Sequence, residues 1–356
     1  MKKSFISSFV VCTLALGLCL AWPGAGHAGK KKLQLNFASV YMNRHNTVVN
    51  GFKPWMKEIE EKTNGRVKMN YFDPNTLCPM KEHWDSTVMG AVDFGTNYCP
   101  FNPGKFVLAE AMEMPLIVPS AEAGSLVTWE LYNKYPEWRA QFKDAKLLWQ
   151  WTSATYQLHT KSQMIRTLED LKGKKIIGWS PKLLQMIKLL GASPIDITST
   201  DSYLAIERGM ADGVLCPLAP IRSFKISDAA KYHTIIDMNV GPFWAAMNTA
   251  LWDSLPADIR KVFEETTGEK MARICGQTLD QGAVADSQWL KKQGGHEFYV
   301  VPEQEKARWF KAVTPLHEEW IKRAEKRGFK NARAILDDAV RLGKKYAKTT
   351  GRGYQE

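Results

Sequence analysis

The chain of 356 residues is 45% hydrophobic and 24% charged, the balance of a soluble globular protein that is too long for one small core. We therefore expect about two domains. Its formal charge of +11 comes from basic residues mixed with acidic ones, without zinc-ligand spacing or an RNA-binding aromatic motif, which argues against nucleic acid as a partner and favours an effect on solubility and surface field.

The first 28 residues have the pattern of a secretory signal peptide. Two lysines precede an apolar run over residues 9–22, and small residues allow cleavage near Ala28. Leu18 is too large for lipoprotein processing at Cys19, so we expect a free mature chain in the periplasm. Loss of the two lysines lowers the formal charge from +11 to +9. No later stretch reaches the roughly 18 apolar residues of a membrane helix.

Four cysteines remain after the leader: Cys78, Cys99, Cys216 and Cys275. In so large an exported protein they do not make a disulfide framework. Cys78 and Cys99 form one candidate pair, but we interpret the four mainly as small buried residues.

The first part of the mature chain alternates strands with helices. Strands are expected at residues 32–40, 65–72 and 91–96, and helices at 46–62 and from the loop 73–79 to about 90. This order is typical of a parallel doubly wound sheet. The polar-aromatic loops 41–45 and 97–103 then follow strand carboxyl ends, the edge at which open α/β sheets bind ligands.

Residues 168–194 read as a polar turn, a strand at 175–178 and a helix. Ser180 is the expected N-cap of that helix, with Pro181 at its first position. A helix N-terminus beside a strand end presents free N–H groups to the negative end of a ligand. We therefore interpret this stretch as half of a binding cleft.

A second α/β set and a helical end complete the chain. Extended segments are expected at 144–160, 211–215 and 232–247, and long helical segments at 257–293, 303–327 and 331–347. Because no Gly/Ser-rich linker separates the sets, we expect two lobes that share strands. The expected division is residues 29–154 with 245–300 in lobe I, 155–244 in lobe II, and C-terminal helices over 301–356 packing across both.

A series of different short motifs is spread between residues 33 and 320. They include Leu171-Lys-Gly-Lys-Lys-Ile176, Leu190-Gly-Ala-Ser-Pro194, Tyr203-Leu-Ala-Ile206, Ala211-Asp-Gly213, Trp252-Asp-Ser-Leu-Pro256, Glu61-Lys-Thr-Asn-Gly-Arg-Val67 and Gly90-Ala-Val-Asp-Phe94. Together they resemble the periplasmic solute-binding subunits of tripartite ATP-independent periplasmic (TRAP) transporters, dicarboxylate-receptor type. The resemblance implies an α/β, two-lobed periplasmic binding protein with a helical C-terminal segment. Such a protein closes on one small ligand and passes it to integral membrane subunits, without catalysis, cofactor or metal.

The polar anchors that the resemblance leads us to expect are replaced in this chain. The arginine that pairs with a ligand carboxylate corresponds to Ile177, and a second arginine to Tyr156. The asparagine before the Pro-Leu pair corresponds to Cys216, and the glutamate of sugar-acid receptors to Asn97 or Tyr98. A buried carboxylate without a partner costs several kcal/mol, so either another group takes it or the ligand has no buried anion.

Two groups of residues are candidates for holding an anion. One is Ser180 with the N–H groups after Pro181 and Lys182, at a helix N-terminus. The other is Asn43, Arg44 and His45, on the opposite lobe.

Aromatic residues gather at the predicted cleft edge: Tyr98, Trp149, Trp151, Tyr156, Trp179, Phe243 and Trp244. Ring faces suit an aromatic ligand, or a quaternary ammonium group through cation–π contacts. Because no carboxylate for a cation cage stands out, we favour an aromatic ligand such as tryptophan or indole pyruvate. The predicted ligand-binding residues are Trp179, Ile177, Ser180, Tyr156, Trp151, Tyr98, Asn97, Cys216, Ser199, Trp244, Arg44 and His45.

Two alternatives stay open. In the first, the ligand is a small cationic or sulfonate solute that needs no conventional carboxylate anchor. In the second, the protein is a secreted enzyme that uses Cys216 as a nucleophile. No base is placed beside Cys216, and nucleophile-elbow, zinc-protease and phosphate-loop motifs are absent from the sequence. We therefore expect a receptor without enzyme activity. The oligomeric state stays open, and a monomer is favoured over an oligomer.

Overall fold

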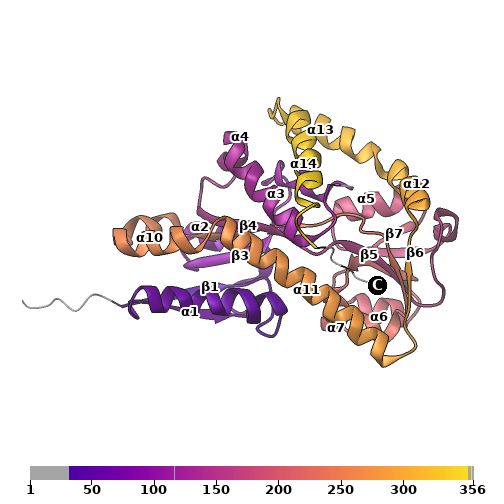
Figure 1. Ribbon diagram of the computed structural model, residues 1–356, viewed down its shortest axis with the longest axis horizontal. Coiled ribbons are helices and arrows are strands. Elements are labelled where there is room, and N and C mark those ends of the chain that lie inside the picture. Colours follow the sequence, from indigo (N-terminus) through magenta and orange to yellow (C-terminus); the bar gives the residue numbers. More distant parts are fainter. Residues whose placement is uncertain (1–31, 116, 352–353, 355–356) are drawn as a thin grey trace, which may run out of the picture.

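Two mixed sheets form the two lobes of the molecule (Figure 1). The computed structural model describes residues 32–115, 117–351 and 354, so the predicted signal peptide lies outside the described residues. Sheet A of lobe I has the strand order β2-β1-β3-β10-β4, and sheet B of lobe II has the order β11-β9-β5-β8-β6-β7. The long helix α11 (Glu269–Gln293) runs from one lobe to the other.

Lobe I confirms the expected parallel sheet and adds two strands to it. β1 pairs in parallel with β2 and β3, whereas β10 pairs antiparallel with β3 and β4. The strands are β1 Leu33–Ala38, β2 Val67–Phe72, β3 Phe94–Tyr98, β4 Lys146–Thr152 and β10 Pro242–Met247. The helices and short turns are η1 Val48–Phe52, α1 Lys53–Lys62, η2 Met80–Glu82, α2 His83–Met89, η3 Cys99–Phe101, η4 Ala109–Glu113, α3 Ala121–Lys134, α4 Pro136–Ala140, α9 Thr249–Ser254 and α10 Ala257–Thr266.

Lobe II is built around sheet B. Its strands are β5 Tyr156–Thr160, β6 Lys175–Gly178, β7 Ser193–Asp196, β8 Gly213–Pro217, β9 Tyr232–Ile235 and β11 Glu297–Val300. Its helices and turns are η5 Leu168–Leu171, α5 Pro181–Leu189, α6 Ser202–Glu207, α7 Ala219–Ser223 and α8 Ile226–Ala229. β11 pairs with β9, so residues 297–300 belong to the sheet of lobe II, although the sequence division had placed them in lobe I.

Two chain segments cross between the sheets and bond to each other. The amide of Ser153 donates to the carbonyl of Gly241 at 2.8 Å, and the amide of Gly241 donates to the Ser153 hydroxyl at 2.8 Å. The amide of Tyr156 donates to the carbonyl of Asn239 at 2.9 Å. The expected strand at 232–247 is therefore split at this crossing into β9, in sheet B, and β10, in sheet A, while the crossing backbone keeps its hydrogen bonds.

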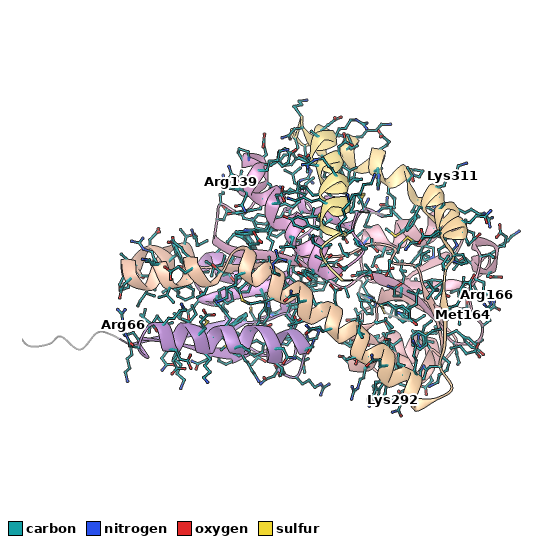
Figure 2. The ribbon with its side chains drawn as sticks, viewed as in Figure 1. Arg66, Arg139, Met164, Arg166, Lys292 and Lys311 are labelled. Atoms are coloured by element: carbon teal, nitrogen blue, oxygen red, sulfur yellow. The ribbon has the colours of Figure 1, made fainter. Side chains whose placement is uncertain are left out.

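The C-terminal helices cover both lobes (Figure 1). They are α12 Glu303–Val313, α13 Pro315–Lys326 and α14 Ala332–Tyr346. α12 contacts α5 of lobe II, and α14 contacts α3 of lobe I. Pro315 separates α12 from α13 because it has no N–H to continue the helix. Charged side chains such as Lys292 of α11 and Lys311 of α12 project outward (Figure 2).

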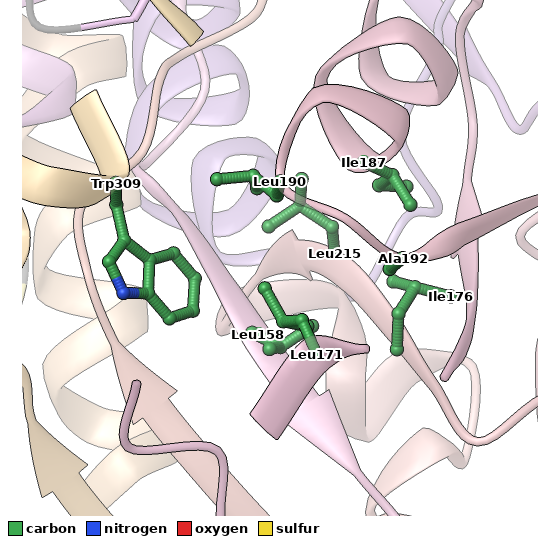
Figure 3. A pocket seen from close by; sticks show the side chains of 8 residues that line it. All are labelled: Leu158, Leu171, Ile176, Ile187, Leu190, Ala192, Leu215 and Trp309. Carbon is green, nitrogen blue, oxygen red and sulfur yellow. The ribbon is translucent and has the colours of Figure 1, made fainter. Parts of the chain in front are cut away.

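The interior of lobe II contains one small apolar cavity behind sheet B (Figure 3). Its lining residues are Leu158, Leu171, Ile176, Ile187, Leu190, Ala192, Leu215 and Trp309. This lining has no polar group apart from the Trp309 indole N–H, which donates to Glu305. We interpret the cavity as a packing gap in the core. None of the helices within the described ranges has the length and apolar character that crossing a bilayer demands.

Candidate ligand-binding cleft

A row of aromatic rings lies at one edge of sheet A. Phe243 of β10 pairs in register with Tyr98 of β3 and with Trp151 of β4. Because directly paired residues share a face of the sheet, the three rings are neighbours. The Phe243 ring lies 5.2 Å from Trp151, nearly parallel at 14°, and 5.0 Å from Tyr98. We call these three rings, together with Tyr41, the lobe I wall.

Tyr41 completes this wall from the loop after β1. Its ring lies 5.8 Å from Phe243. The Trp151 indole N–H donates to its hydroxyl at 3.3 Å, and the Tyr71 hydroxyl donates to its carbonyl at 2.6 Å. Burial raises the pKa of Tyr41 above its usual value. The ring is therefore a fixed, protonated part of the wall.

His45 stacks on the outer end of the lobe I wall. Its ring lies 4.0 Å from that of Tyr41, at an interplanar angle of 3°. Burial lowers the pKa of His45 to about 4, so the imidazole is neutral at pH 7. Its Nδ1 accepts from the amide of Thr47 at 3.2 Å, which places the proton on Nε2. Within the described residues Nε2 has no hydrogen-bond partner, so this N–H is free to donate.

Lobe II presents an apolar face to the same region. Ile177 of β6 pairs with Val214 of β8, and Cys216 lies two residues further on the same face. Ile177 and Cys216 share one buried cluster with Tyr98, Trp151 and Phe243, and Trp179 packs against it. This cluster extends through both lobes, so Ile177 and Cys216 of lobe II belong to the same continuous apolar core as the rings of lobe I.

Trp179 follows directly after β6. Its indole N–H donates to the hydroxyl of Ser202 at 3.0 Å. Its ring meets Phe224 edge-on, with the centroids 5.9 Å apart. These two contacts hold the half-buried ring in place at the side of the cleft that belongs to lobe II.

Several predicted site residues lie elsewhere. Trp244 pairs in register with Asn97, so both lie on the face of sheet A opposite Phe243. Trp244 packs edge-on against Trp84 at 5.0 Å, and the Asn97 amide bonds to the carbonyl of Met80. The structure therefore places Trp244 and Asn97 in the core behind the wall.

Three further candidates have less central positions. Tyr156 is buried at the crossing between the lobes, where burial raises its pKa. Ser199 is half-buried in the connection between β7 and α6. Arg44 is exposed on the loop beside His45, and within the described part of the chain it makes no ion pair.

The N-terminus of α5 confirms the predicted cap but has an unexpected neighbour. The Ser180 hydroxyl oxygen accepts from the amide of Leu183 at 3.3 Å, with Pro181 at the first helical position. The Ser180 hydroxyl in turn donates to Oε1 of Glu113 at 3.3 Å. The same oxygen accepts from the Tyr98 hydroxyl at 2.8 Å. A carboxyl group therefore already lies at the helix end that the sequence offered to a ligand anion.

Glu113 is the residue that sequence reasoning missed. It is 2% exposed, and burial raises the pKa of its carboxyl to about 7. Asn239, in the crossing segment, donates from its amide to the Glu113 carbonyl at 3.2 Å. A signal was present, because Glu113 is an acidic residue inside an otherwise largely apolar stretch. Such residues are seldom buried without a specific role.

Lys182 is directed away from the lobe I wall. It is 5% exposed, and its amine donates to Gln185 at 2.8 Å and lies 3.7 Å from the carboxylate of Glu319 on α13. Burial lowers the pKa of this amine. Lys182 is therefore engaged between α5 and α13.

A chain of three histidines lies in lobe II. His159 Nε2 bonds to the carbonyl of Cys216 at 3.1 Å, so it carries a proton. His159 Nδ1 lies 2.9 Å from His233 Nδ1, and His233 Nε2 lies 2.9 Å from His296 Nδ1. Each contact needs one proton, so a neutral chain satisfies all of them. Burial lowers the pKa of His159 to about 3 and that of His233 well below its usual value.

Two α/β lobes joined by paired crossing segments, with one buried apolar cluster that extends through both, define a solute-binding protein of the two-lobed class. The family model for bacterial extracellular solute-binding proteins of family 7 matches residues 37–323, and the chain belongs to this family. The predicted fold class and the resemblance to TRAP receptors are thereby confirmed.

Three relatives illustrate the family. The C4-dicarboxylate-binding periplasmic protein DctP of Rhodobacter capsulatus is 26% identical over 270 residues, 75% of this chain and 80% of that protein. A TRAP solute-binding protein from Rhodoferax ferrireducens T118, solved with copurified benzoate, has a TM-score of 0.83 and 25% identity, covering 90% of this chain and 100% of its own. A marine metagenome TRAP protein specific for aromatic acid ligands, solved with 3-hydroxybenzoate, has a TM-score of 0.83 and 27% identity, covering 89% and 99%.

Proposed function

We propose that this TRAP receptor captures a small aromatic acid, for which tryptophan and indole pyruvate are the candidates that the sequence favoured. The observation that carries the proposal is the set of neighbouring rings Tyr98, Trp151 and Phe243, which belong to the same buried apolar cluster as Ile177. Tyr41 and Trp179 pack against this cluster. Ring faces and an aliphatic side chain occupy the region where the resemblance to the family places an arginine. Stacking between aromatic rings contributes about 0.5–1.5 kcal/mol per pair beyond the buried area. The ligand is held mainly through its ring.

The carboxylate of this ligand is directed toward Arg44 and His45. The neutral His45 offers a free Nε2–H, and the Arg44 guanidinium lies on the same loop without an ion pair among the described residues. A hydrogen bond from a charged group contributes about 1.5–3 kcal/mol. At the N-terminus of α5, by contrast, Glu113 lies within hydrogen-bond distance of Ser180. A ligand anion there would face a second carboxyl.

The solved relatives support the aromatic class. The Rhodoferax protein holds benzoate, and the marine protein is specific for aromatic acids. TRAP binding proteins work with membrane permease subunits, so we infer that such subunits receive the ligand from this chain. We place the mature protein in the periplasm, after cleavage near Ala28.

Catalysis by Cys216 is not part of the proposal. Burial raises the pKa of its thiol well above the usual value, which keeps it protonated. The neighbouring His159 bonds to the carbonyl of Cys216. Within the described residues, the His, Cys, Asp and Glu side chains form no group that could hold a metal ion.

One observation favours a second candidate, an aromatic amine. A site for an organic cation combines a carboxyl group with aromatic rings, and the Glu113 carboxyl bonds to the hydroxyl of Tyr98. The Glu113 carboxyl accepts hydrogen bonds from two neutral hydroxyl groups, those of Tyr98 and Ser180. The amine of a ligand could therefore supply the positive charge that neither hydroxyl group provides.

A thermal-shift screen tests the proposal. The panel contains benzoate, 3-hydroxybenzoate, tryptophan, indole pyruvate, tryptamine, benzenesulfonate and succinate. We expect aromatic carboxylates to raise the melting temperature most, because a ligand that binds only the folded state stabilises it. A response to succinate or tryptamine alone would refute the proposal. Mass spectrometry of the ligand after incubation checks that the protein has not altered it chemically.

A further inference from the structure

The lobe I wall has chemically different ends. At one end His45 stacks on Tyr41 at 4.0 Å, and the rings then continue through Phe243 at 5.8 Å to Tyr98 at 5.0 Å. At the other end the Tyr98 hydroxyl bonds to Glu113 at 2.8 Å. Three rings therefore separate a hydrogen-bond donor from a buried carboxyl.

The two hydroxyl groups that bond to Glu113 can only accept a further hydrogen bond from a ligand. The hydroxyl protons of Tyr98 and Ser180 are both donated to Glu113 Oε1. The Ser180 oxygen also accepts from the amide of Leu183. With Glu113 ionised, this end of the wall is compatible with an apolar group, a hydroxyl or a ring N–H, and neither of the two hydroxyl groups has a proton left for a ligand carboxylate.

No cation forms an ion pair with Glu113 among the described residues. The groups around it are Tyr98 on β3, Cys99 on η3, Tyr156 on β5, Ser180 and Lys182 on α5, and Glu110 on η4, which faces Arg323 on α13. The Lys182 amine lies near Glu319, and Arg323 pairs with Glu110. When Glu113 ionises, its charge is therefore not neutralised locally and repels another anion at this end, strongly because the site excludes water.

We propose that Glu113 determines specificity: it directs the ligand carboxylate toward Arg44 and His45 and excludes solutes with a second carboxylate at the opposite end. The ligand class is then an aromatic monocarboxylate whose far end is apolar or carries a hydroxyl or ring N–H. This inference rests on the proposed function and refines it.

The probes are benzoate, 4-hydroxybenzoate and terephthalate, which differ only in the group opposite the carboxylate. Affinities are measured by isothermal titration calorimetry with the full mature chain, Glu113→Gln and Glu110→Gln. Glu110→Gln is the matched control, because Glu110 lies on the same turn but pairs with Arg323. Circular dichroism checks that each variant is folded.

We expect terephthalate to bind the wild type at least about tenfold more weakly than benzoate, because like charges meet in a desolvated site. Glu113→Gln reduces this difference in affinity by about tenfold, whereas Glu110→Gln does not reduce it, because the Glu113 carboxylate remains. The wild-type gap also widens from pH 6 to pH 8, as Glu113 ionises through a pKa of about 7. This second readout needs no variant, so it remains decisive if Glu113→Gln does not fold.

Equal discrimination by the wild type and Glu113→Gln, or a gap that does not change with pH, would overturn this inference and leave the proposed function standing. If no aromatic monocarboxylate binds the wild type, both this inference and the proposed function are refuted.

Discussion

Replacement of Ile177 by arginine tests why this receptor needs aromatic ligands. Ile177 is 0% exposed and lies in the apolar cluster between the lobes. An arginine there buries a guanidinium without a carboxylate partner, and an uncompensated buried charge destabilises a protein by about 3–5 kcal/mol. Part of this loss is avoided if the long side chain reaches solvent along the cleft.

A simple carboxylate such as succinate is expected to restore part of the stability that the Ile177→Arg variant loses. A hydrogen bond to a charged group contributes about 1.5–3 kcal/mol, which corresponds to roughly 10–150-fold tighter binding of succinate than by the wild type. Differential scanning fluorimetry gives the melting temperature with and without succinate, and calorimetry gives the affinity. The expected result is a large loss of stability without ligand and partial recovery with it.

Ile176→Arg is the matched control. Ile176 is the preceding residue on β6, is equally buried at 1% exposure, and faces the apolar cavity on the other side of sheet B (Figure 3). This variant should lose stability and gain nothing from succinate. If Ile177→Arg also fails to respond to succinate, the absence of arginine at position 177 does not determine ligand class, and the reasoning is refuted.

Three more results are expected. Trp179→Ala weakens binding of an aromatic acid by about 1 kcal/mol or more without unfolding the protein, and unchanged calorimetric affinity would remove Trp179 from the site. Arg44→Gln weakens aromatic carboxylates but not the neutral ring analogue benzamide, so equal losses for both would exclude an electrostatic role. The pKa of His159 and of His233 is lowered in the folded state, so their neutral pairing stabilises the fold above pH 6.5 and less as pH falls toward 3. Glu113, with its raised pKa, acts in the opposite sense. Urea unfolding should therefore show that the advantage in unfolding free energy of the wild type over the double glutamine variant of these histidines shrinks as the pH falls from 6.5 to 5. A difference in unfolding free energy that does not change with pH would contradict the role given to these two histidines.

Local patterns in the sequence predicted much of the fold. Alternation and capping signals located the strands of the first sheet and the N-cap at Ser180, because these features depend on neighbouring residues. The single helical segment predicted over 303–327 is wrong at Pro315, where the structure divides it into α12 and α13. Membership of β11 in sheet B depends on a strand partner more than 60 residues away, which periodicity does not reveal.

The cleft shows the same division between local and long-range information. Phe243 and Trp244 are adjacent and both aromatic, and only the register of β10 with its neighbours assigns the first to the wall and the second to the core. Glu113 reaches Ser180 across 67 positions of sequence. No short motif connects these two residues, so sequence reasoning offered the helix end to a ligand anion.

A crystal structure with the aromatic acid that binds most tightly shows where the ligand lies. We expect its ring between the lobe I wall and Trp179, with the carboxylate within hydrogen-bond distance of His45 Nε2 or the Arg44 guanidinium. A ligand carboxylate bound at Ser180 and the N-terminus of α5, or a ring that contacts neither Phe243 nor Trp179, would contradict it.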